Sequence, residues 1–300
     1  MPDSVIAKII KPEIFDFVKI RERYVNPDPE VPAQKNYKIS LCTTCMDRLD
    51  DLMKTLPKNM EDNYYKETKS EGSNLSNSWG YPNVEFVLLN YGSKKDNIGN
   101  WIKNQWKDSK SIIDHRLEYF EFVPGTEPKT YSMAHSRNVA FKAASGDIVL
   151  NVDADNYTNV GFASFINVCA NQYPHKTAFV KGKQLLRGRV GFFKQEFVNL
   201  LGGYDEGFDG YGYDDLDIVT RALFAGFIGV CHGGQFVGWV KDHKKHESME
   251  NYKNPDWKYT QRKNQLISYL NIFSGRYKVN EGMHWGRAKL IKNFKEEIEL

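Results

Sequence analysis

The sequence predicts an α/β fold in which helices flank a mostly parallel sheet. Three observations lead to this class. Continuous apolar runs of strand length recur along the chain, segments with helical spacing separate them, and 300 residues suffice for one large domain with a substantial core. Hydrophobic residues make up 41% and charged residues 26% of the chain, which is typical of a globular protein rather than a disordered one.

The first half alternates strands and helices in order. Apolar runs predict strands over residues 37–44, 84–92, 117–123 and 148–152. Helical spacing of Leu49, Leu52, Met53 and Leu56 predicts a helix after the first strand, and further helices are predicted near 97–106 and over 131–144. This rhythm favours a parallel sheet, in which ligands bind at the carboxyl ends of the strands.

The second half is less regular. We predict an amphipathic helix near 194–201, a glycine-rich loop, a helix over about 214–225 and a strand near 228–231. The last segment looks like two helices of mixed charge. The predicted organisation is therefore an N-terminal extension (1–35), one main domain (36–250) and C-terminal helices packed on that domain (251–300).

Composition excludes several classes of protein. The net charge of +3 is not concentrated in a long basic block, so no nucleic-acid partner is expected. The cysteines Cys42, Cys45, Cys169 and Cys231 lack the spacing of a zinc ribbon, and we interpret them as reduced packing residues. No apolar run approaches the ~18 residues of a membrane span, and the N-terminus does not resemble a signal peptide. We expect a cytoplasmic protein, either free or peripheral at a membrane surface.

Two acids follow the strand at 148–152 directly. Asp153 and Asp155 form an Asp-x-Asp pair in "GDIVLNVDADNY". Neighbouring carboxylates repel each other, and a divalent metal between them removes that repulsion. Their hard oxygens suit Mg²⁺ or Mn²⁺, which also bind diphosphate oxygens and so assist a departing nucleotide. The alternative interpretation is that both aspartates are helix caps or turn residues.

Four segments in a fixed order resemble GT-A glycosyltransferases of the family 2 type. They are "SLCTTCMDRLDDLMKTLP", "VEFVLLNYGSKKD", "SMAHSRNVAFKAASGDIVLNVDAD" and "GGYDEGFDGYGYDDLDIVTRAL". The last is similar to the C-terminal segment of β-1,4-galactosyltransferases and chondroitin-polymerase-type enzymes. The resemblance covers about residues 37–250. It implies a single Rossmann-like GT-A domain that transfers a sugar from a nucleotide-diphosphate donor, most simply a UDP-sugar, to a carbohydrate or other hydroxyl acceptor, with inversion.

The resemblance also implies residues for the nucleotide. Thr43 and Thr44, with Arg48, would lie beside the base and ribose. Asn90 stands where the family usually has an aspartate, which puts that base contact in doubt, although an asparagine can still bond the uracil edge. Arg137 would lie near the nucleotide, because a guanidinium suits phosphate. Asp153 would contact the ribose or metal-bound water.

The acceptor side is carried by "GYGYDDLD". Asp215 stands for the family's general base and Asp214 for the acid that holds the acceptor sugar, as an inverting transfer requires a carboxylate opposite the leaving diphosphate. Tyr211 replaces a tryptophan and, with Tyr213, would contact the acceptor sugar. The alternative for the two acids is helix capping.

The metal would be Mn²⁺ or Mg²⁺. Asp155 would bind it directly, with Asp153 as a further ligand, and the resemblance places a histidine downstream. His243 and His246 both fit, and a histidine ligand favours manganese. The alternative is a solvated His/Lys stretch. Lys181 and Arg189 are interpreted as a charged surface loop.

Three other functions stay open. A retaining GT-A transferase would share most of these motifs, although Asp215 favours inversion. A nucleotidyltransferase would carry a Gly-rich phosphate loop after the first strand, which "CTTCMDR" is not. A non-catalytic nucleotide-sugar-binding protein would not need the Asp-x-Asp pair, Asp215 and a downstream histidine together.

Overall fold

The computed structural model describes residues 23–64, 80–108, 116–182, 189–240 and 249–300. In these residues one ten-stranded sheet has the order β1-β9-β7-β8-β5-β2-β3-β4-β11-β12. The strands are β1 (Tyr24–Val25), β2 (Ile39–Cys45), β3 (Val84–Asn90), β4 (Leu117–Phe122), β5 (Ile148–Asn151), β7 (Thr177–Val180), β8 (Val190–Phe193), β9 (Ile228–Cys231), β11 (Lys289–Lys292) and β12 (Glu296–Glu299). A two-stranded sheet pairs β6 (Asn156–Tyr157) with β10 (Gly238–Trp239).

The sheet is mostly parallel, as predicted. Strands β5, β2, β3 and β4 run parallel to one another, and so do β7, β9 and β1. The antiparallel members are β8, between β5 and β7, and the hairpin β11–β12 beside β4. All seven residues of β2 are buried, which is typical of a central strand covered on both faces.

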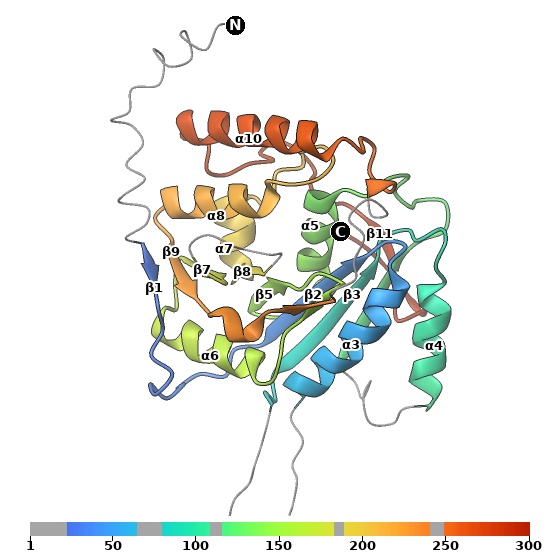
Figure 1. The fold of residues 1–300 in the computed structure, drawn as a ribbon, viewed down its shortest axis with the longest axis horizontal. Coiled ribbons are helices and arrows are strands. Elements are labelled where there is room, and N and C mark those ends of the chain that lie inside the picture. The colour runs from blue at the N-terminus through green and yellow to red at the C-terminus, as the bar shows by residue number, and fades with distance from the viewer. Residues whose placement is uncertain (1–22, 65–79, 109–115, 183–188, 241–248) are drawn as a thin grey trace, which may run out of the picture.

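Helices cover both faces of the sheet (Figure 1). One apolar cluster joins it to α3 (Leu49–Asn63), α4 (Ile98–Asp108) and α6 (Phe162–Gln172). The other joins it to α5 (Met133–Ala143), the helical segment α7–η2 (Lys194–Glu196 and Phe197–Leu201) and α8 (Asp214–Phe224). Outside α8 lies α10 (Trp257–Phe273), and a short 3-10 turn, η3 (Gly234–Phe236), precedes β10.

Of the two helices predicted in the C-terminal segment, the first is confirmed as α10. The prediction of the second is wrong, because residues 289–299 form the hairpin β11–β12. Leu290 is fully buried opposite Phe122 of β4, and Asn293 and Phe294 adopt the positive φ angles that close a tight hairpin turn. At the other edge, Tyr24 and Val25 of the predicted N-terminal extension join the sheet by pairing with β9. The three predicted domain ranges otherwise stay a prediction.

All four cysteines are free thiols in the structure, and three of them are buried, as the sequence indicated. No helix among the described residues is long and apolar enough to cross a membrane.

Candidate active site

The Asp-x-Asp pair lies in a turn at the carboxyl end of β5. Val152 follows β5 directly, and its N–H donates to the Cys42 carbonyl of β2. The Asn156 N–H donates to the Asp153 carbonyl and closes the turn. The Asp153 carboxylate accepts from Asn151 Nδ2 at 2.7 Å and from Arg137 Nη2 at 3.1 Å. The Asp155 carboxylate accepts from Arg48 Nη2 at 3.2 Å. Both side chains remain partly exposed, at 35% and 21%.

Arg137 joins this turn to the second acidic segment. Its Nη1 lies 2.8 Å from the Asp215 carboxylate and also donates to Asp214, while Nη2 donates to the Asp153 carboxylate. Burial alone would lower the pKa of Arg137, but Asp215 and Asp153 raise it well above its ordinary value. One buried guanidinium on α5 thus brings together acids that lie about 60 residues apart in the sequence.

Asp214 and Asp215 occupy the first turn of α8. The N-cap position belongs to Tyr213, and no side chain caps the helix there. The capping interpretation is therefore wrong for both aspartates, whose carboxylates instead face Arg137. A helix N-terminus favours ionised carboxylates through its dipole. Asp214 is 6% exposed and Asp215 16%, so Asp215 is the more accessible of the two.

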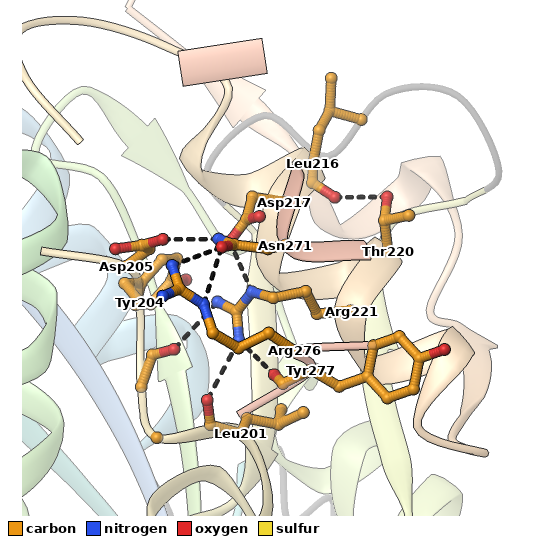
Figure 2. Close-up of polar contacts among 12 residues, drawn as sticks. Leu201, Tyr204, Asp205, Leu216, Asp217, Thr220, Arg221, Asn271, Arg276 and Tyr277 are labelled. Carbon is orange, nitrogen blue, oxygen red and sulfur yellow. Dashed lines mark hydrogen bonds and ion pairs between the residues drawn. The ribbon is translucent and has the colours of Figure 1, made fainter. Parts of the chain in front are cut away.

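A buried arginine holds the loop that leads into α8. Figure 2 shows Arg221 surrounded by Asp217, Leu201 and Tyr277. Its Nε donates to Asp217 at 2.7 Å, and its other nitrogens reach the carbonyls of Leu201, Gly203 and Tyr277 at 2.9–3.1 Å. These hydrogen bonds pair backbone carbonyls in the protein interior. They fix where the loop starts and hence where Asp214 and Asp215 lie.

Helix α10 holds the same loop from its other side. Thr260 Oγ1 donates to the Tyr211 carbonyl and accepts from its N–H, at 3.0 and 3.2 Å. The Asn264 amide pairs with both backbone groups of Asp209 and with the Gly212 carbonyl, at 2.9–3.2 Å. Gly210 has φ +68°, and a Cβ there would lie 2.5 Å from Thr260, so this close approach requires glycine.

Tyrosines line the acid cluster. Burial raises the pKa of Tyr211, and the negative charges of Asp153, Asp215 and Asp155 raise it further, whereas Arg137 opposes the shift. Its ring meets that of Tyr252 edge-on at 6.1 Å. The Tyr213 ring instead lies 6.2 Å from that of Tyr269 on α10.

Two further tyrosines were not predicted from the sequence. Tyr131 meets Tyr252 edge-on at 5.4 Å and pairs through its hydroxyl with Thr44 Oγ1 at 2.8 Å. Burial raises the pKa of both Tyr131 and Tyr252, with Asp153 adding to each shift. Tyr252 had no signal in the sequence, since it lies at the start of a tail that matches no motif.

The residues expected at the nucleotide lie at the carboxyl ends of β2 and β3. Thr43 and Thr44 lie near the end of β2 and are 5% and 7% exposed, and Arg48 follows within hydrogen-bond distance of Asp155. Asn90 ends β3, but its side chain already donates to the Tyr119 hydroxyl at 3.2 Å and accepts from the Ser93 N–H at 3.1 Å. Arg137 joins Asp153, Asp214 and Asp215, and Arg48 pairs with Asp155 of the same Asp-x-Asp turn. The Asn90 amide is instead engaged by Tyr119 of β4 and by Ser93.

Arg189 is not on a surface loop, contrary to the sequence interpretation. It precedes β8, is fully buried and donates from Nη2 to the Tyr157 carbonyl at 3.0 Å. Burial lowers the pKa of Arg189 to about 10, although Asp153 and Asp155 oppose the shift. Among the residues that the structure describes, its Nε and Nη1 have no hydrogen-bond partner, and neither has Nε2 of the buried His232. Arg189 was missed because a glycine on each side made its segment look like a loop.

The Asp-x-Asp turn fits a hard divalent cation. Among the described residues, hydrogen bonds use Oδ1 of Asp153 and Oδ2 of Asp155, so each carboxylate keeps a second oxygen, and oxygen ligands suit Mn²⁺ and Mg²⁺. His243 and His246 lie outside the described residues. Within the part of the chain that the structure describes, no group of three or more His, Cys, Asp or Glu side chains is placed to hold a metal ion.

Comparisons with known proteins identify the fold. No protein-family model and no curated protein matches the chain. The mannosyltransferase PcManGT from Pyrobaculum calidifontis, solved with GDP-Man and Mn²⁺, matches at a TM-score of 0.57 and 16% identity, over 83% of this chain and 66% of that one. S. aureus TarS 1-349, in complex with UDP-GlcNAc, matches at 0.54 and 16%, over 78% and 67%. The chain has the GT-A fold. It spans about two thirds of each of these glycosyltransferases.

Proposed function

We propose that this protein is a glycosyltransferase that moves a sugar from a nucleotide-diphosphate donor, a UDP-sugar, to an acceptor hydroxyl, with a divalent metal and with inversion. The observation that carries the proposal is the Arg137 bridge, which puts the Asp-x-Asp turn and the acids of α8 in one cluster. The GT-A fold supports it, because the two solved neighbours are glycosyltransferases that hold GDP-Man with Mn²⁺ and UDP-GlcNAc.

The two acidic segments would divide the chemistry. Asp153 and Asp155 would hold the metal, with His243 or His246 as a further ligand, and a bound cation supplies positive charge against the leaving diphosphate. Thr43, Thr44 and Arg48 would contact the nucleoside, and Arg137 would keep the acids in place beside the phosphates. Asn90 is a weaker candidate for the base, since its amide is already bonded to Tyr119 and Ser93.

Asp215 would act as the general base. The acceptor oxygen attacks the anomeric carbon, Asp215 takes the acceptor's proton, and the bond from that carbon to the diphosphate oxygen breaks with its electron pair leaving on the nucleotide. Because Asp215 is more accessible than Asp214, we assign the proton transfer to Asp215 and acceptor positioning to Asp214 and Tyr211. Tyr213 would contribute less, because its ring lies against Tyr269.

The experiment is a donor panel. Wild-type protein is incubated with UDP- and GDP-sugars and Mn²⁺, and release of the nucleoside diphosphate is followed. We expect slow hydrolysis of one donor in the wild type and none in Asp155→Ala. Hydrolysis that is equal in both proteins, or no metal-dependent binding of any donor, would contradict the proposal.

A further inference from the structure

Helix α10 is amphipathic in the opposite sense to an ordinary surface helix. The side chains that it buries are mostly polar, namely Thr260, Asn264, Ser268, Asn271 and Ile272. The side chains that it exposes include large apolar ones, namely Tyr259 (56%), Leu266 (59%), Leu270 (60%) and Phe273 (37%). The spacing of seven, four and three residues places these four on one stripe of the helix.

Hydrogen bonds to the rest of the fold account for three of the four buried polar side chains of α10. Thr260 and Asn264 bond the loop that leads to α8, and Asn271 Nδ2 donates to the Asp205 carboxylate at 2.7 Å. The large apolar side chains of the outer stripe are exposed in the part of the chain that the structure describes, and α10 lies on the outer side of α8, away from the sheet (Figure 1). Exposed apolar side chains gathered on one face of an outer helix are typical of a binding surface.

The charges around the stripe indicate what it binds. Arg262 and Lys263 flank the stripe on its two sides, and Lys258 lies one turn earlier. Lys263 also pairs with the Asp209 carboxylate at 3.6 Å. Between Lys253 and Lys278 the chain has six basic residues and one acid, Asp256, whose carboxylate caps α10 by accepting from the N–H groups of Lys258 and Tyr259. Apolar side chains flanked by cations, with no acid on the helix itself, complement an anionic lipid surface.

We propose that the outer face of α10 docks this protein on an anionic membrane surface. Tyr259, Leu266, Leu270 and Phe273 enter the boundary between headgroups and acyl chains, and Lys258 and Arg262 contact lipid phosphates. A second copy of the chain fits this face less well than a membrane does. In a dimer formed by two α10 helices, the cations of each helix would face a helix that has no acidic residue. Docking does not depend on the proposed sugar transfer.

The test is sedimentation with lipid vesicles, without nucleotide or metal. We expect the wild type to sediment with vesicles that contain about 30% phosphatidylglycerol, to stay in solution with pure phosphatidylcholine, and to lose binding as salt rises to about 0.3 M. Leu266→Gln/Leu270→Gln should weaken vesicle binding by about tenfold or more. Lys258→Gln/Arg262→Gln should weaken it by about tenfold at low salt.

The matched control is Met53→Gln/Val160→Gln, which removes two exposed apolar side chains, at 41% and 48%, from the opposite side of the sheet. We expect it to bind vesicles like the wild type. Equal loss in this control, or wild-type binding that ignores lipid charge, would overturn the proposal. So would a wild-type dimer in sedimentation velocity that dissociates in Leu266→Gln/Leu270→Gln while vesicles capture neither protein. Circular dichroism of each variant shows whether it is folded.

Discussion

At the scale of single residues, Arg137 is the side chain that joins the two acidic segments of the candidate site. It carries one positive charge among three carboxylates and is itself almost fully buried. Among the described residues, Asp153, Asp214 and Asp215 all contact the Arg137 guanidinium, and Asp155 pairs with Arg48. A divalent cation bound at Asp153 and Asp155 would add positive charge to this acidic cluster, as the proposed reaction on a diphosphate requires.

Replacing the proposed base separates transfer from donor binding. In Asp215→Asn the amide cannot take the acceptor proton, so we expect the transfer rate to fall by about 10²–10⁴-fold while donor affinity stays within about twofold. Single-turnover kinetics and donor titration measure the two effects. Asp209→Asn, in the same loop but facing Lys263, is the control and should keep both. Equal loss of transfer and donor affinity would remove Asp215 from the role of base.

Buried His232 makes the fold sensitive to acid. Burial and the neighbouring Arg189 lower the pKa of His232 to about 3, so the unfolded chain binds this proton more readily than the folded one. The stabilisation by the neutral imidazole is therefore complete above the ordinary histidine pKa of about 6.5 and is lost as pH falls toward 3. The loss reaches about 2 kcal/mol at pH 5. Urea unfolding at pH 7.5 and at pH 5 measures it: between these two pH values the free energy of unfolding should fall by about 2 kcal/mol less in His232→Asn than in the wild type. An identical pH dependence in both proteins would contradict this account.

At the scale of elements, two buried side chains hold the loop that carries the α8 acids. Arg221 of α8 donates hydrogen bonds to the carbonyls of Leu201, at the start of the loop, and Tyr277. Asn264 of α10 donates hydrogen bonds to carbonyls at the centre of the loop. Local sequence patterns predicted α8 but not this support, because Arg221 and Asn264 act on groups distant in the sequence. The same reason explains the missed hairpin: "KLIKNFKEEIEL" suits a helix locally, and only the pairing of β11 with β4 makes it a strand.

Removing the buried arginine should destabilise the whole fold. Arg221→Met removes the cation that pairs with the buried Asp217 carboxylate and the donor to the Gly203 and Tyr277 carbonyls. We therefore expect the free energy of unfolding to fall by about 3–5 kcal/mol. Chemical denaturation measures it. Arg276→Met, at an exposed arginine nearby, should cost less than about 1 kcal/mol. A loss at Arg221 no larger than that of the control would mean that the network does not support the loop.

Removing the hydrogen bonds between this loop and α10 should raise the KM for the acceptor and leave the affinity for the donor unchanged. Asn264→Ala removes the three hydrogen bonds to Asp209 and Gly212, and we expect a loss of stability of about 1–3 kcal/mol with a raised KM for the acceptor. Donor affinity should stay within about twofold, because the hydrogen bonds of Asn264 go to Asp209 and Gly212 of the acceptor loop. Lys258→Ala, exposed on the same helix, is the control. A changed donor affinity with unchanged acceptor KM would contradict the assignment of this loop to the acceptor.

At the scale of the whole molecule, the parallel strands bring distant segments to one edge of the sheet. The sequence was sufficient for β2, β3, β4 and β5, because buried parallel strands are continuous apolar runs, and for the polar residues that follow them. It was insufficient for Arg189, Tyr131 and Tyr252, which reach the site through long-range packing. Asp153 and Asp155 lie in one turn at the carboxyl end of β5, but their role as metal ligands stays a prediction. The role of His243 and His246 also stays a prediction, since both lie outside the described residues.

The central claim is that a divalent cation on the Asp153–Asp155 turn holds a nucleotide diphosphate beside Asp215. Electron paramagnetic resonance of Mn²⁺ during a UDP titration tests it most directly, since the signal of free Mn²⁺ disappears on binding. We predict UDP-dependent Mn²⁺ binding in the wild type and in Asp215→Asn, and none in Asp155→Ala. Undiminished binding in Asp155→Ala, or no UDP-dependent binding in the wild type, would contradict the account.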